Sequence, residues 1–231
     1  MDPGKILQRA RERTRDGQHD DALADFLWFH RHALEHDRAY YGVRLSFALV
    51  FWNELAAVFP RAGEVLQGVR DQAARKLLSG EGELRELFND VAAIDLELGR
   101  SKDTYDLFTV LRTKRITRTS EYGDLALPCI VEARDWTLAR KIMPHPEQYL
   151  LGASDELNEM LGMKAFSRAT ARTERETIVA IYCENVQLLL RVLEGAGRFE
   201  WASAAKLWAV ALVRTAGFRR LVESQLAARA D

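Results

Sequence analysis

Apolar side chains recur every three or four residues along nearly the whole chain, the spacing that places them on one face of an α-helix. Runs that alternate apolar and polar residues, as half-buried strands do, are nearly missing. The pattern therefore predicts an all-α protein. Prolines and glycines divide the expected helices, which we place at 4–15, 19–37, 41–59, 61–79, 82–98, 101–118, 121–133, 136–143, 146–162, 171–195, 198–215 and 217–229.

The longest unbroken apolar run is Phe47–Trp52, with only Arg44, Asn53 and Glu54 as charged or amide residues near it. A helix that is apolar on nearly every side packs inside a protein or spans a membrane. The apolar stretch 43–59 is at the short limit of the roughly 17 to 25 residues that a membrane span needs. A charge near mid-bilayer also costs at least about 2.5 kcal/mol. We therefore expect a buried central helix and no membrane segment.

The helix expected at 19–37 has two unlike faces. Its apolar stripe contains Ala22, Leu23, Phe26, Leu27, Phe29, Ala33 and Leu34. The candidate binding surface on the opposite side consists of Asp21, Asp25, Trp28, His32 and Glu35. A tryptophan on this side either packs against a neighbouring helix or anchors a partner, and packing is the commoner outcome for large aromatic residues.

A similar hexapeptide joins two amphipathic helices at several places. A glycine-like turn lets the chain reverse, and a small residue five positions later lets the second helix approach the first closely. The four junctions are GQHDDA at 17–22, GRSKDT at 99–104, RDWTLA at 134–139 and GRFEWA at 197–202.

These junctions resemble the helix-turn-helix hairpin of tetratricopeptide repeats, in which a small residue follows the turn glycine and an aromatic residue comes one helical turn later. The matching positions are Gly17, Ala22 and Phe26, then Gly99, Thr104 and Phe108 with threonine in the small position, then Gly197 and Ala202. The junctions at 17, 99, 134 and 197 lie 82, 35 and 63 residues apart, whereas the repeat family has a steady period of about 34. The resemblance implies an irregular array of antiparallel helical hairpins, a divergent α-solenoid or right-handed superhelix. It also implies a non-catalytic scaffold that binds a protein or peptide and needs no cofactor.

The composition fits a soluble globular chain. The 231 residues are 48% hydrophobic and 29% charged, with a formal net charge of -1, so no long-range field draws the chain to nucleic acid or membranes. Cys129 and Cys183 lie among apolar neighbours and are typical of core residues. We expect one helical domain over 1–231, with division near 1–119 and 120–231 as the alternative. The Arg-rich start is no signal peptide, and the expected compartment is the cytoplasm.

One alternative function is a zinc-dependent hydrolase. His32, Glu35 and His36 spell HxxEH, the string of the inverted zinc peptidases. Two histidines one helical turn apart are able to share Zn²⁺, and the glutamate between them is able to act as a general base. A third ligand is needed, for which Glu83, Glu86 and Asp90 are available. Most short matches of this kind are ordinary surface histidines, so we predict no metal site.

A regulatory or nucleic-acid-binding role is the second alternative. Phosphate binding needs several converging cations, and base recognition needs exposed aromatic residues among them. Two basic clusters are present, Arg112, Lys114, Arg115 and Arg118, and Lys164, Arg168, Arg172 and Arg175, with few aromatic residues between them. Such clusters are usually solvated helix faces, and nucleic acid is not the expected partner. Trp28, Tyr40 and Tyr41 equally suit a homodimer interface.

Overall fold

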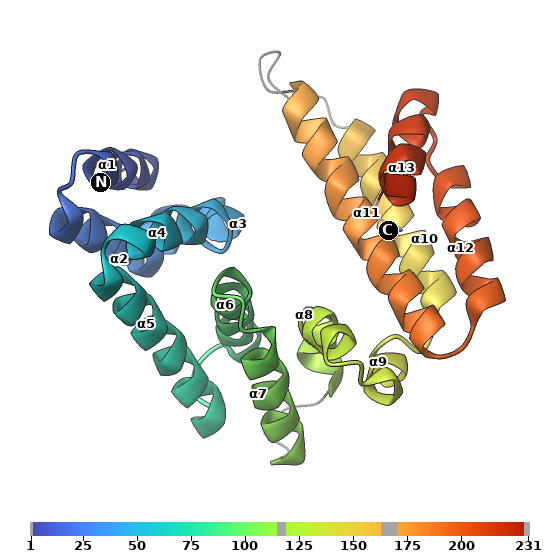
Figure 1. Cartoon of the computed structure of the whole chain (residues 1–231), viewed down its shortest axis with the longest axis horizontal. Coiled ribbons are helices and arrows are strands. Elements are labelled where there is room, and N and C mark those ends of the chain that lie inside the picture. Colours follow the sequence, from blue (N-terminus) through green and yellow to red (C-terminus); the bar gives the residue numbers. More distant parts are fainter. Residues whose placement is uncertain (1, 115–118, 163–170, 229–231) are drawn as a thin grey trace. The chain divides into compact units, whose positions relative to one another are not determined.

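A computed structural model describes residues 2–114, 119–162 and 171–228, and the described residues form helices without any strand (Figure 1). The all-α prediction is confirmed. The helices are α1 (Pro3–Arg15), α2 (His19–His36), α3 (Tyr40–Arg44), α4 (Phe47–Val58), α5 (Pro60–Ser79), α6 (Leu84–Glu97), α7 (Ser101–Thr113), α8 (Thr119–Glu132), α9 (Trp136–Ile142), α10 (Pro146–Gly162), α11 (Ala171–Gly195), α12 (Phe199–Ala211) and α13 (Ala216–Ala228).

The helix expected at 41–59 is two helices. Ser46 has non-helical backbone angles, φ -130° and ψ -98°, and separates α3 from α4. Its hydroxyl donates a 2.7 Å hydrogen bond to the carbonyl oxygen of Gly42. Serine side chains compete in this way for the carbonyl groups of the preceding turn and interrupt helices. The helix expected at 198–215 is also shorter than predicted, because it ends at Ala211.

The chain divides into two compact units, residues 1–129 and 130–231, with the division inside α8. In the first unit, α1 packs on α2, α4 on α2 and α5, α5 on α6, and α6 on α7. The Trp52 ring stacks on Phe26 with 6.1 Å between centroids, and its indole N–H donates to the carbonyl oxygen of Ala62. Phe88, Phe108 and Tyr122 form a second group of buried rings.

In the second unit, α10, α12 and α13 all pack against α11 (Figure 1). The Tyr182 hydroxyl of α11 donates a 2.8 Å hydrogen bond to the carbonyl oxygen of Ala209 in α12 and lies 2.9 Å from the Ser154 hydroxyl of α10. Burial raises the pKa of the Tyr182 hydroxyl. One buried side chain therefore joins three helices. Within the described residues, no helix is long and apolar enough to cross a membrane.

All four hexapeptide junctions reverse the chain in the same way. Gly17, Gly99, Arg134 and Gly197 have φ values of 75°, 67°, 57° and 72°, in the left-handed region. At each, the N–H of the left-handed residue donates to the carbonyl three residues back, and the next N–H donates to the carbonyl five residues back, with N···O distances of 2.6 to 3.4 Å. This is the Schellman pattern of helix ends. The residue five positions after the turn is buried at all four junctions, as a small residue facing a neighbouring helix should be; these residues are Ala22, Thr104, Ala139 and Ala202.

The threonine at the second junction has its own explanation. The Thr104 hydroxyl donates a 2.8 Å hydrogen bond to Asp95, which is fully buried. The guanidinium of Arg70 donates two further hydrogen bonds to the same carboxylate, at 2.8 and 2.7 Å. A buried carboxylate needs this many donors because water does not reach it. Threonine thus keeps the position small and satisfies an ionised group of the preceding helix.

The backbone at the junctions makes a matched pair of alanine substitutions informative. Gly17 and Gly68 both have open space where a Cβ would lie, but only Gly17 has a left-handed φ. We expect Gly17→Ala to lower the free energy of unfolding by about 1 kcal/mol. Gly68→Ala, in the interior of α5, should raise it by up to about 1 kcal/mol. Urea unfolding of both variants measures the difference, and equal effects would contradict the junction's role.

Candidate functional site

The surface of α2 that the sequence singled out is only partly open to solvent. Asp21 and Glu35 are exposed, while Trp28 and His32 are half-buried. The prediction that Asp25 belongs to an open face is wrong. Asp25 is 6% exposed, and its carboxylate accepts hydrogen bonds of 2.8 and 2.6 Å from Arg9 and 2.7 Å from Arg13 of α1. Two arginines one helical turn apart on α1 thereby draw this acid into the α1–α2 interface.

Both histidines of HxxEH lie close to the Trp28 ring. The Trp28 ring is 5.5 Å from the His32 ring and 5.6 Å from the His36 ring, and it also packs against the core of the first unit. His32 Nδ1 lies 3.0 Å from a carboxylate oxygen of Glu35. Trp28 therefore packs against the core and is only partly exposed.

Two of the acids named as third zinc ligands have arginine partners. Glu86 accepts a 2.6 Å hydrogen bond from Arg38, and Asp90 is paired with Arg44. Across the ranges that the structure describes, no group of three or more His, Cys, Asp or Glu side chains is arranged to hold a metal ion.

A buried polar group that the sequence did not indicate joins α2, α3 and α6. Arg44 donates to both oxygens of Asp90 and lies with Nη1 3.2 Å from His30 Nε2. Arg44, which precedes the long apolar run, is thus buried and paired with a carboxylate. Because a guanidinium only donates, His30 Nε2 must accept, and the ring proton lies on Nδ1. Burial, and secondly the charge of Arg44, lower the pKa of His30 to about 3. Burial raises the pKa of Asp90, although Arg44 opposes this shift.

The outer face of α4 is apolar and exposed, so the expectation that this helix is buried on nearly every side is wrong. Leu49, Trp52 and Leu55 are buried, but Phe47 is 61% and Val58 is 60% exposed. We define the α4 outer face as the exposed Phe47, Val50, Glu54 and Val58 together with the half-buried Phe51. These residues share one side of the helix at spacings of three, four and seven residues.

Two aromatic rings and one cation give the α4 outer face a fixed arrangement. The Phe47 and Phe51 rings stack with 6.4 Å between centroids. The Arg11 guanidinium of α1 lies 3.8 Å from the centroid of Phe51, a cation–π contact. The face therefore combines an apolar stripe with one cation at its edge and one carboxylate, Glu54, within it.

The basic clusters expected from the sequence are described only in part. Arg112 lies with its guanidinium 5.9 Å from the centroid of Phe108, and Lys114 caps the end of α7. Arg175 belongs to α11. For the other members, either the whole residue or its side chain lies outside the described part of the chain. These members are Arg115, Arg118, Lys164, Arg168 and Arg172.

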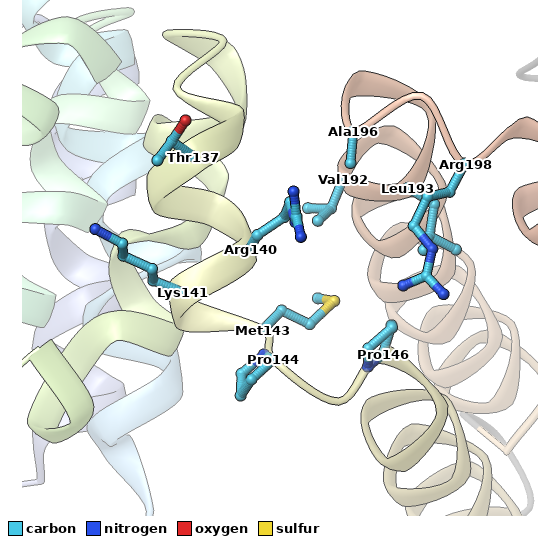
Figure 2. A pocket seen from close by; sticks show the side chains of 10 residues that line it. All are labelled: Thr137, Arg140, Lys141, Met143, Pro144, Pro146, Val192, Leu193, Ala196 and Arg198. Carbon is cyan, nitrogen blue, oxygen red and sulfur yellow. The ribbon is translucent and has the colours of Figure 1, made fainter.

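A cavity of about 410 Å³ lies in the second unit between α9, the start of α10 and the end of α11 (Figure 2). Its floor is apolar and includes the buried side chains of Met143, Val192 and Leu193. Arg140 of α9 and Arg198 of the α11–α12 turn lie on two sides of it. The sequence analysis identified neither of these two arginines as a site residue. The one sequence feature that pointed to them is that Arg140 follows, and Arg198 lies within, a junction hexapeptide.

The position of α9 is set by contacts with α11. The Asp135 carboxylate caps the helix by accepting a 3.0 Å hydrogen bond from the N–H of Leu138. The Trp136 ring lies directly on Gly195, where a Cβ would come within 2.2 Å of an indole carbon. The cavity walls therefore depend on a glycine at the end of α11.

No family model matches the chain, and neither does any curated protein or solved structure with which it was compared.

The pKa of His30 predicts a pH effect on stability. Between pH 6.5 and 3 the unfolded chain takes up a proton on His30 that the folded chain does not, so stability falls as the pH falls. His30→Gln keeps a hydrogen-bond acceptor for Arg44 and does not titrate. We expect the stability advantage of the unsubstituted chain over His30→Gln to shrink by about 2 kcal/mol from pH 7 to pH 5. Urea unfolding at several pH values checks this, and parallel profiles would contradict it.

The contact between Trp136 and Gly195 predicts strong coupling. Gly195→Ala should destabilise the second unit by about 1 to 3 kcal/mol, because the indole ring must move. Gly152→Ala in α10 is the control, since open space surrounds that position. In a Trp136→Leu background, Gly195→Ala should cost little. Thermal unfolding of the four combinations measures the coupling energy, and strict additivity would show that the ring does not restrict this position.

Proposed function

We propose that the chain is a non-catalytic scaffold, built from helical hairpins of the tetratricopeptide kind, that binds a protein or peptide partner in the cytoplasm. The α4 outer face carries the proposal. Single exposed apolar residues are common on soluble proteins, but a stripe of them at helical spacing is typical of a binding surface. Stacked aromatic rings add anchors that lose little conformational entropy on binding.

The groups on this face specify the chemistry of the partner. An amphipathic helical segment with apolar residues three and four positions apart is able to cover Phe47, Phe51 and Val58. A carboxylate on that segment complements Arg11, and a cation complements Glu54. A second copy of this chain carries the same apolar, basic and acidic groups, so self-association is the first case to test.

The test compares Phe47→Glu and Val58→Glu with a matched control. Leu96 is 71% exposed on α6 and lies outside the α4 outer face, so Leu96→Glu adds the same charge elsewhere in the same unit. We expect sedimentation at increasing concentration to detect a dimer, or selection from a random peptide library to yield amphipathic binders. Each α4 variant should weaken the association at least about tenfold. Leu96→Glu should leave it unchanged.

The proposal fails if the chain neither self-associates nor selects such peptides, or if the α4 variants bind as well as the unsubstituted chain. The α2 surface predicted from the sequence is tested with the same binding measurements. His32→Ala removes a half-buried and Glu35→Ala an exposed polar side chain of α2, and a loss of binding in these variants extends the surface to His32 and Glu35.

A further inference from the structure

The cavity of the second unit combines two features of small-molecule sites. Its volume of about 410 Å³ lies within the usual range of ligand pockets, roughly 300 to 1,000 Å³. Its apolar floor contains Met143, Val192 and Leu193, with Pro144 and Pro146 beside them. This floor is able to hold an apolar body of several carbon atoms, and a bare inorganic ion would leave most of it uncovered.

The charges around the cavity are of one sign. Arg140, Lys141 and Arg198 line it, and no acidic side chain does so. Within the part of the chain that the structure describes, none of these three cations is paired with a carboxylate. Figure 2 shows Arg140 reaching toward the end of α11 and Arg198 beside Leu193, while Lys141 points away from both.

Arg198 is held beside the cavity by its own junction. It directly follows the left-handed Gly197, its N–H donates a 2.8 Å hydrogen bond to the carbonyl oxygen of Leu193, and its guanidinium lies 5.4 Å from the centroid of Trp201. Arg140 belongs to α9, which Trp136 fixes against Gly195. Both guanidinium groups therefore come from backbone segments with defined positions, which reduces the ordering cost of binding.

We infer that this cavity binds a small phosphate monoester whose apolar or aromatic body covers the floor. Guanidinium groups donate paired hydrogen bonds to phosphate oxygens. Two such cations match the double negative charge of a phosphate monoester better than the single charge of a carboxylate. The site lies wholly in residues 130–231 and shares no residue with the α4 outer face, so the inference does not rest on the proposed function.

Phenyl phosphate is the probe, titrated calorimetrically into the full chain at low salt. We expect saturable binding that is at least about tenfold tighter than that of benzoate, inorganic phosphate or phenol. Arg140→Gln and Arg198→Gln should each weaken it about tenfold or more, and Arg198→Lys should weaken it less than Arg198→Gln. Higher salt should weaken binding, because an exposed ionic contact is screened.

One variant serves as the control. Arg214→Gln removes an exposed cation that lies elsewhere in the same unit, does not line the cavity and pairs with Asp155. It should change the affinity less than about threefold. Thermal unfolding confirms that the variants remain folded.

The inference is overturned if phenyl phosphate shows no saturable binding up to about 10 mM, which corresponds to roughly 2.7 kcal/mol of binding free energy. It is equally overturned if Arg140→Gln and Arg198→Gln bind as tightly as the unsubstituted chain, because binding would then lie elsewhere. Equal affinity for benzoate excludes a dianion site, equal affinity for inorganic phosphate excludes a role for the floor, and equal affinity for phenol excludes a role for the arginines.

Discussion

The reversal of the chain at a single left-handed residue is the constraint on which both units depend. Two backbone hydrogen bonds close the first helix, and the second helix begins two residues later, so the two helices must lie against each other at once. A small side chain five residues after the turn allows a close approach, and Ala22, Thr104, Ala139 and Ala202 are all buried. Arg134 takes the left-handed position without being glycine. That conformation costs roughly 1 to 2 kcal/mol, which its two hydrogen bonds and the Asp135 cap help to offset.

Buried ionic groups then fix how helices that meet this way are aligned. Asp25 ties α1 to α2, Asp95 ties α5, α6 and α7 together, and Arg44 joins α3 to α2 and α6. Replacing such a pair by apolar residues is often neutral, but losing one partner costs about 3 to 5 kcal/mol because a charge stays buried and unpaired. These groups therefore penalise a shifted helix more than they stabilise the correct one, and their main effect is on the register of packing.

Local spacing was sufficient to predict that the chain is helical and where the four junctions lie, but not the break at Ser46 within the helix expected at 41–59. The core stripe of α2 followed from periodicity alone, and Ala22, Phe26, Phe29 and Ala33 are buried as predicted. Burial of polar residues was not predictable in that way. Asp25 lies on the polar side of α2, and its burial depends on arginines of another helix. Arg140 and Arg198 lie 58 residues apart in the sequence and meet at one cavity, while the basic clusters taken from the sequence relied on nearness along the chain.

Exposed apolar residues have different meanings in α4 and α12. In α12 the buried positions are Ala202, Ala205 and Ala209, while Phe199, Leu207 and Trp208 are exposed at positions that turn around the helix axis by about 80° to 100° from one to the next. No common face results. In α4 the exposed residues fall on one side, because their spacings of three, four and seven match the helical period. An amphipathic helical segment is able to cover such a stripe all at once, and association then removes a contiguous apolar surface from water. Apolar residues of similar exposure therefore indicate a binding surface in α4 but not in α12, because only in α4 do their side chains point to the same side of the helix.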